Sequence, residues 1–168
     1  LLSALSSSLG KLTGLNVNHV LLEGHGREDI FPDLDITNTV GWFTSMYPVA
    51  LPMENDVRNL VIGIKESLRT VPNNGIGYGV LYGYNSDELP YLTFNYLGQF
   101  DTNKIQEQND WSFIHMNMGR SFSERNKDKS IISFNGGVFD GELQFYVSSS
   151  LEDAKHAELL ESYKDALR

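Results

Sequence analysis

The spacing of the apolar residues constrains the fold of this chain more than any other feature. Near the start, Leu2, Leu5, Leu9 and Leu12 follow each other at steps of three and four residues, the period of one face of a helix. Residues 91–98 instead carry apolar or aromatic side chains at alternate positions, which is the period of a strand. Segments of both kinds are interleaved along the chain. This pattern predicts an α/β fold in which a mixed sheet is flanked by helices.

A second helix is expected in the middle of the chain. Apolar residues between Val57 and Val71 again recur at steps of three and four, Asn55 or Asp56 can serve as the N-cap, and Pro72 closes the far end. The glycine-rich segment 72–79 that follows is expected to be a bend that opens no further helix. A nucleotide-binding turn would need its glycines between a strand and a helix, so we reject that function for this segment.

Three further segments have the branched and aromatic composition of strands, namely residues 16–23, 39–49 and 113–118. The second of these is expected to end near Pro48, because proline donates no hydrogen bond to a sheet. Between the first two lies the segment 24–32, where two glycines and a proline predict a loop at the end of a strand.

A hairpin and a helix are predicted at the end of the chain. Asp140-Gly141 separates two strand-like runs, residues 131–139 and 142–148, and an Asp-Gly pair in that position is a strong hairpin signal. Ser150 and Asp153 then resemble a capping pair that opens a helix. The expected apolar stripe of this helix consists of Leu160, Tyr163 and Leu167.

The charge of the chain argues against a role in binding nucleic acid. Its 168 residues include 13 basic and 22 acidic side chains, for a formal net charge of −9. No stretch gathers the lysines and arginines that nonspecific binding to phosphates requires. No apolar run approaches the ~20 residues that cross a bilayer, so we expect no membrane span.

The absence of cysteine excludes disulfides, a thiolate nucleophile and cysteine-based metal sites. It is compatible with a reducing compartment, and we expect a cytoplasmic protein. The chain opens with Leu1 inside the first apolar stripe and has no basic flank of the kind that precedes a secretory signal. We therefore expect it to be cropped or processed from a longer chain.

The segment Glu23-Gly-His-Gly-Arg-Glu28 is the strongest candidate for chemistry. In an extended backbone Glu23, His25 and Arg27 share one face, while Gly24 and Gly26 leave the other face bare, so that another segment can approach the backbone closely. One hypothesis makes Glu23 a general base favoured by partial burial and tuned by His25 or Arg27. The alternative is a solvated turn with an internal pair between arginine and a carboxylate.

Other chemistry fits the sequence less well. Glu23, His25 and Glu28 match no zinc-binding spacing, so no metal is expected. No Gly-x-Ser-x-Gly elbow supports a serine hydrolase. Asn95 and Tyr96 carry an amide and a phenol that can stabilise an oxyanion, but neighbouring strand residues face one cavity only if a bulge or twist intervenes.

Aromatic residues offer a further candidate surface. Trp42, Phe43 and Tyr47, together with Phe94 and Tyr96, could line a binding channel. The alternative, that most of them are core residues, is the more ordinary role of aromatic side chains.

Four motifs in order resemble those of epimerization domains in nonribosomal peptide synthetases: Glu23–Glu28, Thr39–Pro48, Pro72–Gly79 and Phe94–Gly98. The resemblance spans the whole chain. It implies a chloramphenicol-acetyltransferase-like lobe, with residues 1–168 forming the C-terminal half of a domain of the condensation superfamily.

The resemblance also implies a function. Such domains invert the Cα centre of an aminoacyl or peptidyl thioester, from L to D, on the 4′-phosphopantetheine arm of a carrier protein, and they bind no cofactor directly. Glu23 is similar to the family's catalytic glutamate, and Asn95 and Tyr96 match catalytic motif residues. His25, Arg27 and Trp42 would bind substrate by orienting the loop and shaping the channel.

Two departures from the family pattern are visible. Asn38 stands where the family's second motif begins with arginine, and a His-His-x-x-x-Asp-Gly motif is absent because no two histidines are adjacent. In the family that motif belongs to the N-terminal lobe, so we expect this lobe as a partner and expect the chain alone to be inactive. Cations between Arg120 and Lys129 are candidates for docking the carrier protein. Two alternatives stay open: an amide-forming condensation-type domain, and a noncatalytic lobe that docks a carrier protein.

Overall fold

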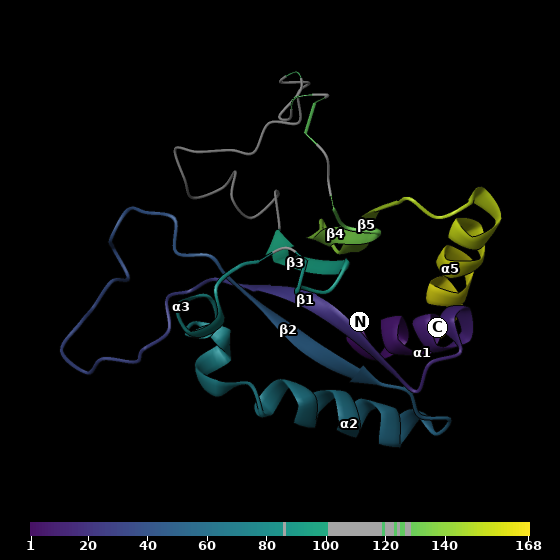
Figure 1. Ribbon diagram of the computed structural model, residues 1–168, viewed down its shortest axis with the longest axis horizontal. Coiled ribbons are helices and arrows are strands. Elements are labelled where there is room, and N and C mark those ends of the chain that lie inside the picture. Colours follow the sequence, from purple (N-terminus) through teal and green to yellow (C-terminus); the bar gives the residue numbers. More distant parts are fainter. Residues whose placement is uncertain (86, 101–118, 120–122, 124, 127–128) are drawn as a thin grey trace.

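The strands of the described chain form one mixed sheet (Figure 1). The computed structural model describes residues 1–85, 87–100, 119, 123, 125–126 and 129–168. In these residues a five-stranded sheet has the order β2-β1-β3-β4-β5. The strands are β1 (Val17–Gly24), β2 (Ser45–Pro52), β3 (Leu92–Phe100), β4 (Ile132–Phe139) and β5 (Glu142–Ser149). The expected strand at 113–118 lies outside the described residues, as does most of the segment 120–129.

Helices flank this sheet, as the sequence predicts. They are α1 (Leu2–Thr13), α2 (Val57–Arg69), α5 (Asp153–Ala166), the short α3 (Tyr78–Tyr82) and the 3-10 helix η1 (Pro72–Gly75). Helix α2 runs beside β2, and α1 packs against α5 at the end of the sheet where both chain termini lie (Figure 1).

Two parallel pairs form the centre of the sheet, and an antiparallel pair lies on each side of them. Strand β1 pairs antiparallel with β2 over its whole length, from Val17 opposite Pro52 to Gly24 opposite Ser45. Strand β3 is parallel to both of its neighbours, β1 and β4. Strands β4 and β5 form the predicted hairpin, with φ of 51° at Asp140 and 85° at Gly141, so the two turn residues have the positive φ of the type I′ turn that favours this pair.

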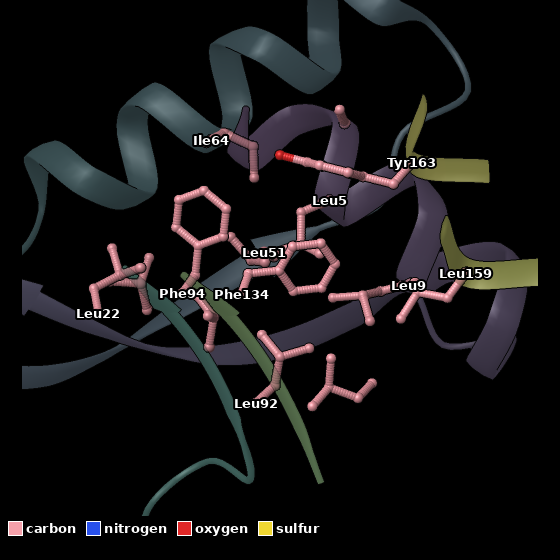
Figure 2. Packing of buried hydrophobic residues seen from close by; sticks show 14 of the residues in the cluster. Leu5, Leu9, Leu22, Leu51, Ile64, Leu92, Phe94, Phe134, Leu159 and Tyr163 are labelled. Carbon is pink, nitrogen blue, oxygen red and sulfur yellow. The ribbon is translucent and has the colours of Figure 1, made fainter. Parts of the chain in front are cut away.

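The hydrophobic core lies between the sheet and the helices (Figure 2). Phe134 of β4 is fully buried at its centre, with its ring centroid 5.1 Å from that of Tyr163 in α5 and 6.1 Å from that of Phe94 in β3. Leu5 and Leu9 of α1 close the core from the helix side and are also buried. Edge-to-face and tilted aromatic contacts of this kind stabilise a core beyond the area they bury.

The first two predicted helices are confirmed. Helix α1 ends at Gly14, which has a φ of 71°. Helix α2 begins after Asp56, whose side-chain oxygen accepts a hydrogen bond from the Asn59 backbone N–H at 2.9 Å, and it buries Leu60 and Ile64. Both apolar stripes therefore face the core as their spacing indicates.

The prediction of a strand over residues 39–49 is wrong at its start. Strand β2 begins at Ser45 and continues through Pro48 to Pro52, while residues 39–44 are irregular. The physical reason is a contact outside the sheet: the backbone carbonyl of Thr39 accepts a hydrogen bond at 2.8 Å from the side chain of Arg27, twelve positions earlier.

Two details of the last helix are also wrong. Its N-cap is Glu152 without a side-chain capping bond, so Ser150 and Asp153 form no capping pair. The buried stripe consists of Leu159 and Tyr163, because packing against α1 and the aromatic core selects a face one residue away from the predicted Leu160. Leu167 is exposed.

The glycine-rich bend contains more helix than expected. Residues 72–75 form η1, and Gly77 precedes the five-residue helix α3. The segment still follows α2 rather than a strand, so it lacks the strand-to-helix setting of a nucleotide-binding turn.

We predict that Phe134→Ala lowers the free energy of unfolding by about 3–5 kcal/mol, because it leaves a cavity in the aromatic core. Urea denaturation of the two proteins measures this difference. The matched control is Tyr146→Ala on β5, where the side chain is 77% exposed and the expected loss is below about 1 kcal/mol. Equal losses in the two variants would contradict the assignment of Phe134 to the core centre.

We predict that Tyr163→Phe raises the free energy of unfolding by about 1 kcal/mol at neutral pH. Among the described residues the buried Tyr163 hydroxyl has no hydrogen-bond partner, and leaving such a group unsatisfied costs stability. Burial also raises the pKa of Tyr163 in the folded protein. The stability of the unsubstituted protein therefore falls as the pH rises above ~10, where the unfolded chain releases the phenol proton and the folded chain retains it. Denaturation at pH 7 and pH 10.5 should therefore show a larger advantage of the variant at the higher pH. A destabilised variant at both values would show that the hydroxyl has a partner.

Candidate functional site

Two strands that run in the same direction place a carboxylate beside an amide. In the β1–β3 pair, Leu21 lies opposite Thr93 and Leu22 opposite Phe94, so the next residues, Glu23 and Asn95, are neighbours. The Asn95 Nδ2 atom donates a hydrogen bond to Glu23 Oε2 at 3.1 Å. Among the described residues the other carboxylate oxygen, Oε1, accepts no hydrogen bond. The contact therefore fixes the carboxylate and leaves one oxygen available to a ligand.

A hollow of about 570 Å³ opens at this edge of the sheet. We call it the β1–β3 hollow, and its lining residues come from the ends of three strands, the loop after β1 and η1: Glu23, Gly24, His25, Glu28, Thr44, Tyr47, Asn74, Asn95, Tyr96, Leu97 and Gly98. Of the six predicted catalytic and substrate-binding residues, four are thus brought together, namely Glu23, His25, Asn95 and Tyr96. Arg27 and Trp42 do not line this hollow.

Asn95 and Tyr96 both line the hollow, and β3 becomes irregular directly after them. The register of the β3–β4 pair shifts between Tyr96 and Gln99, and Gly98 has a φ of 100°. Asn95 and Tyr96 themselves pair in one register with Asn135 and Gly136, so no bulge separates the two residues and they line the hollow from opposite faces of β3. Tyr96 is half-exposed, so its phenol is accessible from the hollow.

The loop after β1 is held by a chain of hydrogen bonds through His25 and Glu28. His25 Nδ1 accepts a bond from the Arg27 backbone N–H at 3.0 Å, and His25 Nε2 lies 3.2 Å from Glu28 Oε1. In the first contact Nδ1 is the hydrogen-bond acceptor, and the second brings the other ring nitrogen beside a carboxylate oxygen. With both ring nitrogens engaged, His25 organises the loop.

Glu28 is fixed from a second direction by a strained turn. Its Oε2 accepts a hydrogen bond from Asn74 Nδ2 at 2.7 Å. Asn73, Asn74 and Gly75 have consecutive positive φ values of 46°, 50° and 79°. Left-handed conformations cost energy in residues other than glycine, although asparagine tolerates them best, and they persist where surrounding contacts enforce them. The turn thus holds the Asn74 amide against the site.

Tyr47 packs between the same turn and the hollow. A side chain at Gly75 would overlap the Tyr47 ring, so glycine is required there for steric as well as backbone reasons. Burial, and secondarily the negative charge of Glu28, raises the pKa of Tyr47. Tyr47 is therefore an uncharged phenol at neutral pH.

The two glycines near Glu23 permit the close approach that the sequence predicts. A side chain at Gly26, where φ is 66°, would overlap the backbone carbonyl oxygen of Phe43. A side chain at Gly24 would come within 3.0 Å of the Ser45 hydroxyl. The segment that approaches these two glycines is thus the start of β2 together with the residues just before it.

Arg27 fastens the long loop between β1 and β2, which projects from the sheet (Figure 1). Its guanidinium donates to the carbonyl oxygens of Ile36 at 2.6 Å and Thr39 at 2.8 Å, and lies 4.1 Å from the centre of the Phe43 ring. The expected pair between arginine and a carboxylate is therefore replaced by backbone carbonyls. Trp42 is carried on the same loop with 91% of its surface exposed.

The partial burial expected of Glu23 is wrong for the described chain, where this side chain is exposed. Val20, Leu21 and Leu22, which precede Glu23 in β1, are buried, but the hollow beyond them is open.

Within the described residues no cluster of three or more histidine or acidic side chains could hold a metal ion.

Asn74 lines the hollow but was given no site role from the sequence, whereas Tyr47 was a candidate channel residue and Glu28 was considered only as a metal ligand. The pair Asn73-Asn74 before Gly75 is the signal that could have indicated a left-handed turn, because these residue types tolerate positive φ. Nothing local in the sequence indicates that this turn lies against Glu28, 46 positions earlier.

No helix in the described part of the chain combines the length and apolar character needed to cross a membrane.

Comparisons with known proteins agree on one family. The family model described as "Condensation domain" matches residues 1–166. Bacitracin synthase 2 of Bacillus licheniformis is 38% identical over 100% of this chain, and surfactin synthase subunit 2 of Bacillus subtilis is 36% identical over 99%. The chain spans only 7% and 5% of the lengths of these relatives.

Solved structures agree with this family. The epimerization domain from the third module of tyrocidine synthetase B has a TM-score of 0.84 and 34% identity, covering 99% of this chain and 40% of that one. The first condensation domain of the CDA synthetase has a TM-score of 0.63 at 12% identity over 98% of this chain and 37% of that one, which shows a shared fold. The predicted chloramphenicol-acetyltransferase-like lobe is confirmed.

We predict that Gly26→Ala destabilises the protein by about 1–3 kcal/mol more than Gly14→Ala. Both glycines have positive φ, 66° and 71°, so both variants carry the backbone cost of alanine in that region. Nothing lies within 4 Å of a side chain at Gly14, whereas Gly26 meets the Phe43 backbone, and overpacking of this kind adds its own cost. Thermal and urea denaturation measure the difference. Equal losses would mean that the loop can move away from Gly26 without cost.

Proposed function

The chain belongs to the condensation-domain family, and from this we propose that it supplies the C-terminal half of an epimerization domain in a nonribosomal peptide synthetase. The proposed reaction inverts the Cα centre of an aminoacyl or peptidyl group, from L to D. The group is carried as a thioester on the 4′-phosphopantetheine arm of a carrier protein. This arm belongs to the substrate, and the proposal requires no resident cofactor.

One observation carries the proposal: the Glu23 carboxylate, held by Asn95 at 3.1 Å, stands at the mouth of a hollow that Tyr96 also lines. Removal of a proton from a carbon beside a carbonyl needs a positioned base and a donor for the oxygen that becomes negative. Glu23 provides the first kind of group and the Tyr96 phenol the second. The 34% identity to a solved epimerization domain, against 12% for the solved condensation domain of the CDA synthetase, supports the choice.

The proposed steps follow from these positions. Glu23 Oε1 accepts the Cα proton, and the electrons of the broken C–H bond move into the thioester carbonyl to form an enolate. Tyr96 donates a hydrogen bond to the enolate oxygen. A proton is then delivered to the opposite face of Cα, and the carbonyl reforms. We assign the second proton donor to the N-terminal lobe, because the hollow presents Glu23 from one side.

Two partners belong to the proposal. The first is the N-terminal lobe, since this chain covers 40% of the solved epimerization domain. The second is the carrier protein. Both partners would meet the open side of the β1–β3 hollow, where Glu23, His25 and Tyr96 are exposed.

We predict that Glu23→Gln lowers Cα proton exchange by ~100-fold or more, the low end of a general-base contribution. The measurement is deuterium incorporation from D₂O into an aminoacyl thioester on its carrier protein, with the N-terminal lobe supplied. The matched control is Glu54→Gln, which makes the same change at an exposed glutamate after β2 and should leave exchange unchanged.

The outcomes separate the alternatives. Equal exchange by both glutamate variants would keep an epimerase and remove Glu23 from its centre. No exchange by the unsubstituted protein would favour the amide-forming condensation-type domain or a noncatalytic lobe that docks a carrier protein.

A further inference from the structure

A second pocket lies behind the site, between β2, the end of α2, η1 and α3. We call it the β2–α3 pocket; its volume is about 500 Å³. Its walls are mostly aliphatic and aromatic, including Ile30, Val49, Val71, Ile76, Leu81 and Tyr82. Among the described residues no charged side chain lines it. A pocket of this size and character has the usual properties of a site for a small apolar group.

The pocket adjoins the β1–β3 hollow along three segments. Tyr47 lines both spaces. On the loop after β1, Glu28 lines the hollow and Ile30 lines the pocket. In η1, Asn74 lines the hollow and Asn73 the pocket. The two spaces therefore meet at the half-buried ring of Tyr47, whose position is fixed by contact with Gly75.

We propose that the β2–α3 pocket receives the apolar side chain of the amino acid whose Cα is presented to Glu23, with Tyr47 forming the passage between them. This inference rests on the proposed function. The hollow holds the carboxylate, amide and phenol groups that act on the thioester end of the substrate. The adjoining pocket offers the uncharged surface that the other end of an aliphatic or aromatic amino acid requires. Burial of that side chain would hold Cα in place for proton transfer.

The inference predicts that filling the pocket lowers the exchange rate for amino acids with large side chains more than the rate for small ones. Ser67 lines the pocket from α2, so Ser67→Phe reduces the space available. We expect the ratio of exchange rates for leucyl over alanyl thioesters, and for phenylalanyl over alanyl thioesters, to fall about tenfold or more, since single apolar groups change specificity by ~10–200-fold. The matched control, Asn59→Phe, makes a similar change at an exposed position of α2 outside the pocket and should leave both ratios unchanged.

The experiment measures deuterium incorporation into alanyl, leucyl and phenylalanyl thioesters on one carrier protein, with the N-terminal lobe supplied. Retained alanyl exchange shows that a variant is folded. Thr70→Phe, at an exposed position lining the same pocket, repeats the test independently of Ser67. Unchanged ratios in the two filling variants, or an equal loss for all three side chains in both, would overturn the inference. Absence of exchange in the unsubstituted protein would instead remove the proposed function itself.

Discussion

The parallel pairing of β1 with β3 is the constraint on which the site depends. It joins Glu23 to Asn95 across 72 positions of sequence, and their hydrogen bond exists only in this register. Side chains alternate between the two faces of a strand, so a slip of one residue would turn Asn95 away from Glu23 and Phe94 out of the core. The aromatic core around Phe134 therefore fixes the register that the chemistry needs, since the same strand supplies both Phe94 and Asn95.

A strained turn in η1 organises the loop beside Glu23. The left-handed turn at Asn73–Gly75 directs one amide to Glu28 and leaves room for the Tyr47 ring. Glu28 in turn holds His25, which accepts the Arg27 backbone N–H. These contacts connect η1 to the loop after β1 without passing through the sheet. The loop thus has a defined path beside Glu23, although most of its residues belong to no strand or helix.

Much of the fold could be predicted because local period and turn chemistry determine it. The stripe of α1, the cap of α2 at Asp56 and the Asp140-Gly141 hairpin each depend on residues a few positions apart. The irregular segment 39–44 could not be predicted, since its composition favours a strand and a distant side chain, Arg27, binds the Thr39 carbonyl instead. Likewise, the buried face of α5 is selected by packing against α1. Glu23, Asn95 and Tyr96 were identifiable one by one, but their shared hollow depends on a long-range pairing.

The strand order also has a consequence for how the protein reaches its native state. Strands β4 and β5 are joined by a two-residue turn, and hairpins of this kind form within about 1–10 μs. Strands β1 and β3 are adjacent in the sheet but are separated in sequence by β2, α2, η1 and α3. Non-local pairings of this kind form slowly. The carboxylate and its amide partner are therefore expected to meet late in folding. Partly folded chains would carry an aromatic hairpin long before they carry the β1–β3 hollow, so the proposed proton transfer would be confined to molecules whose central sheet is complete.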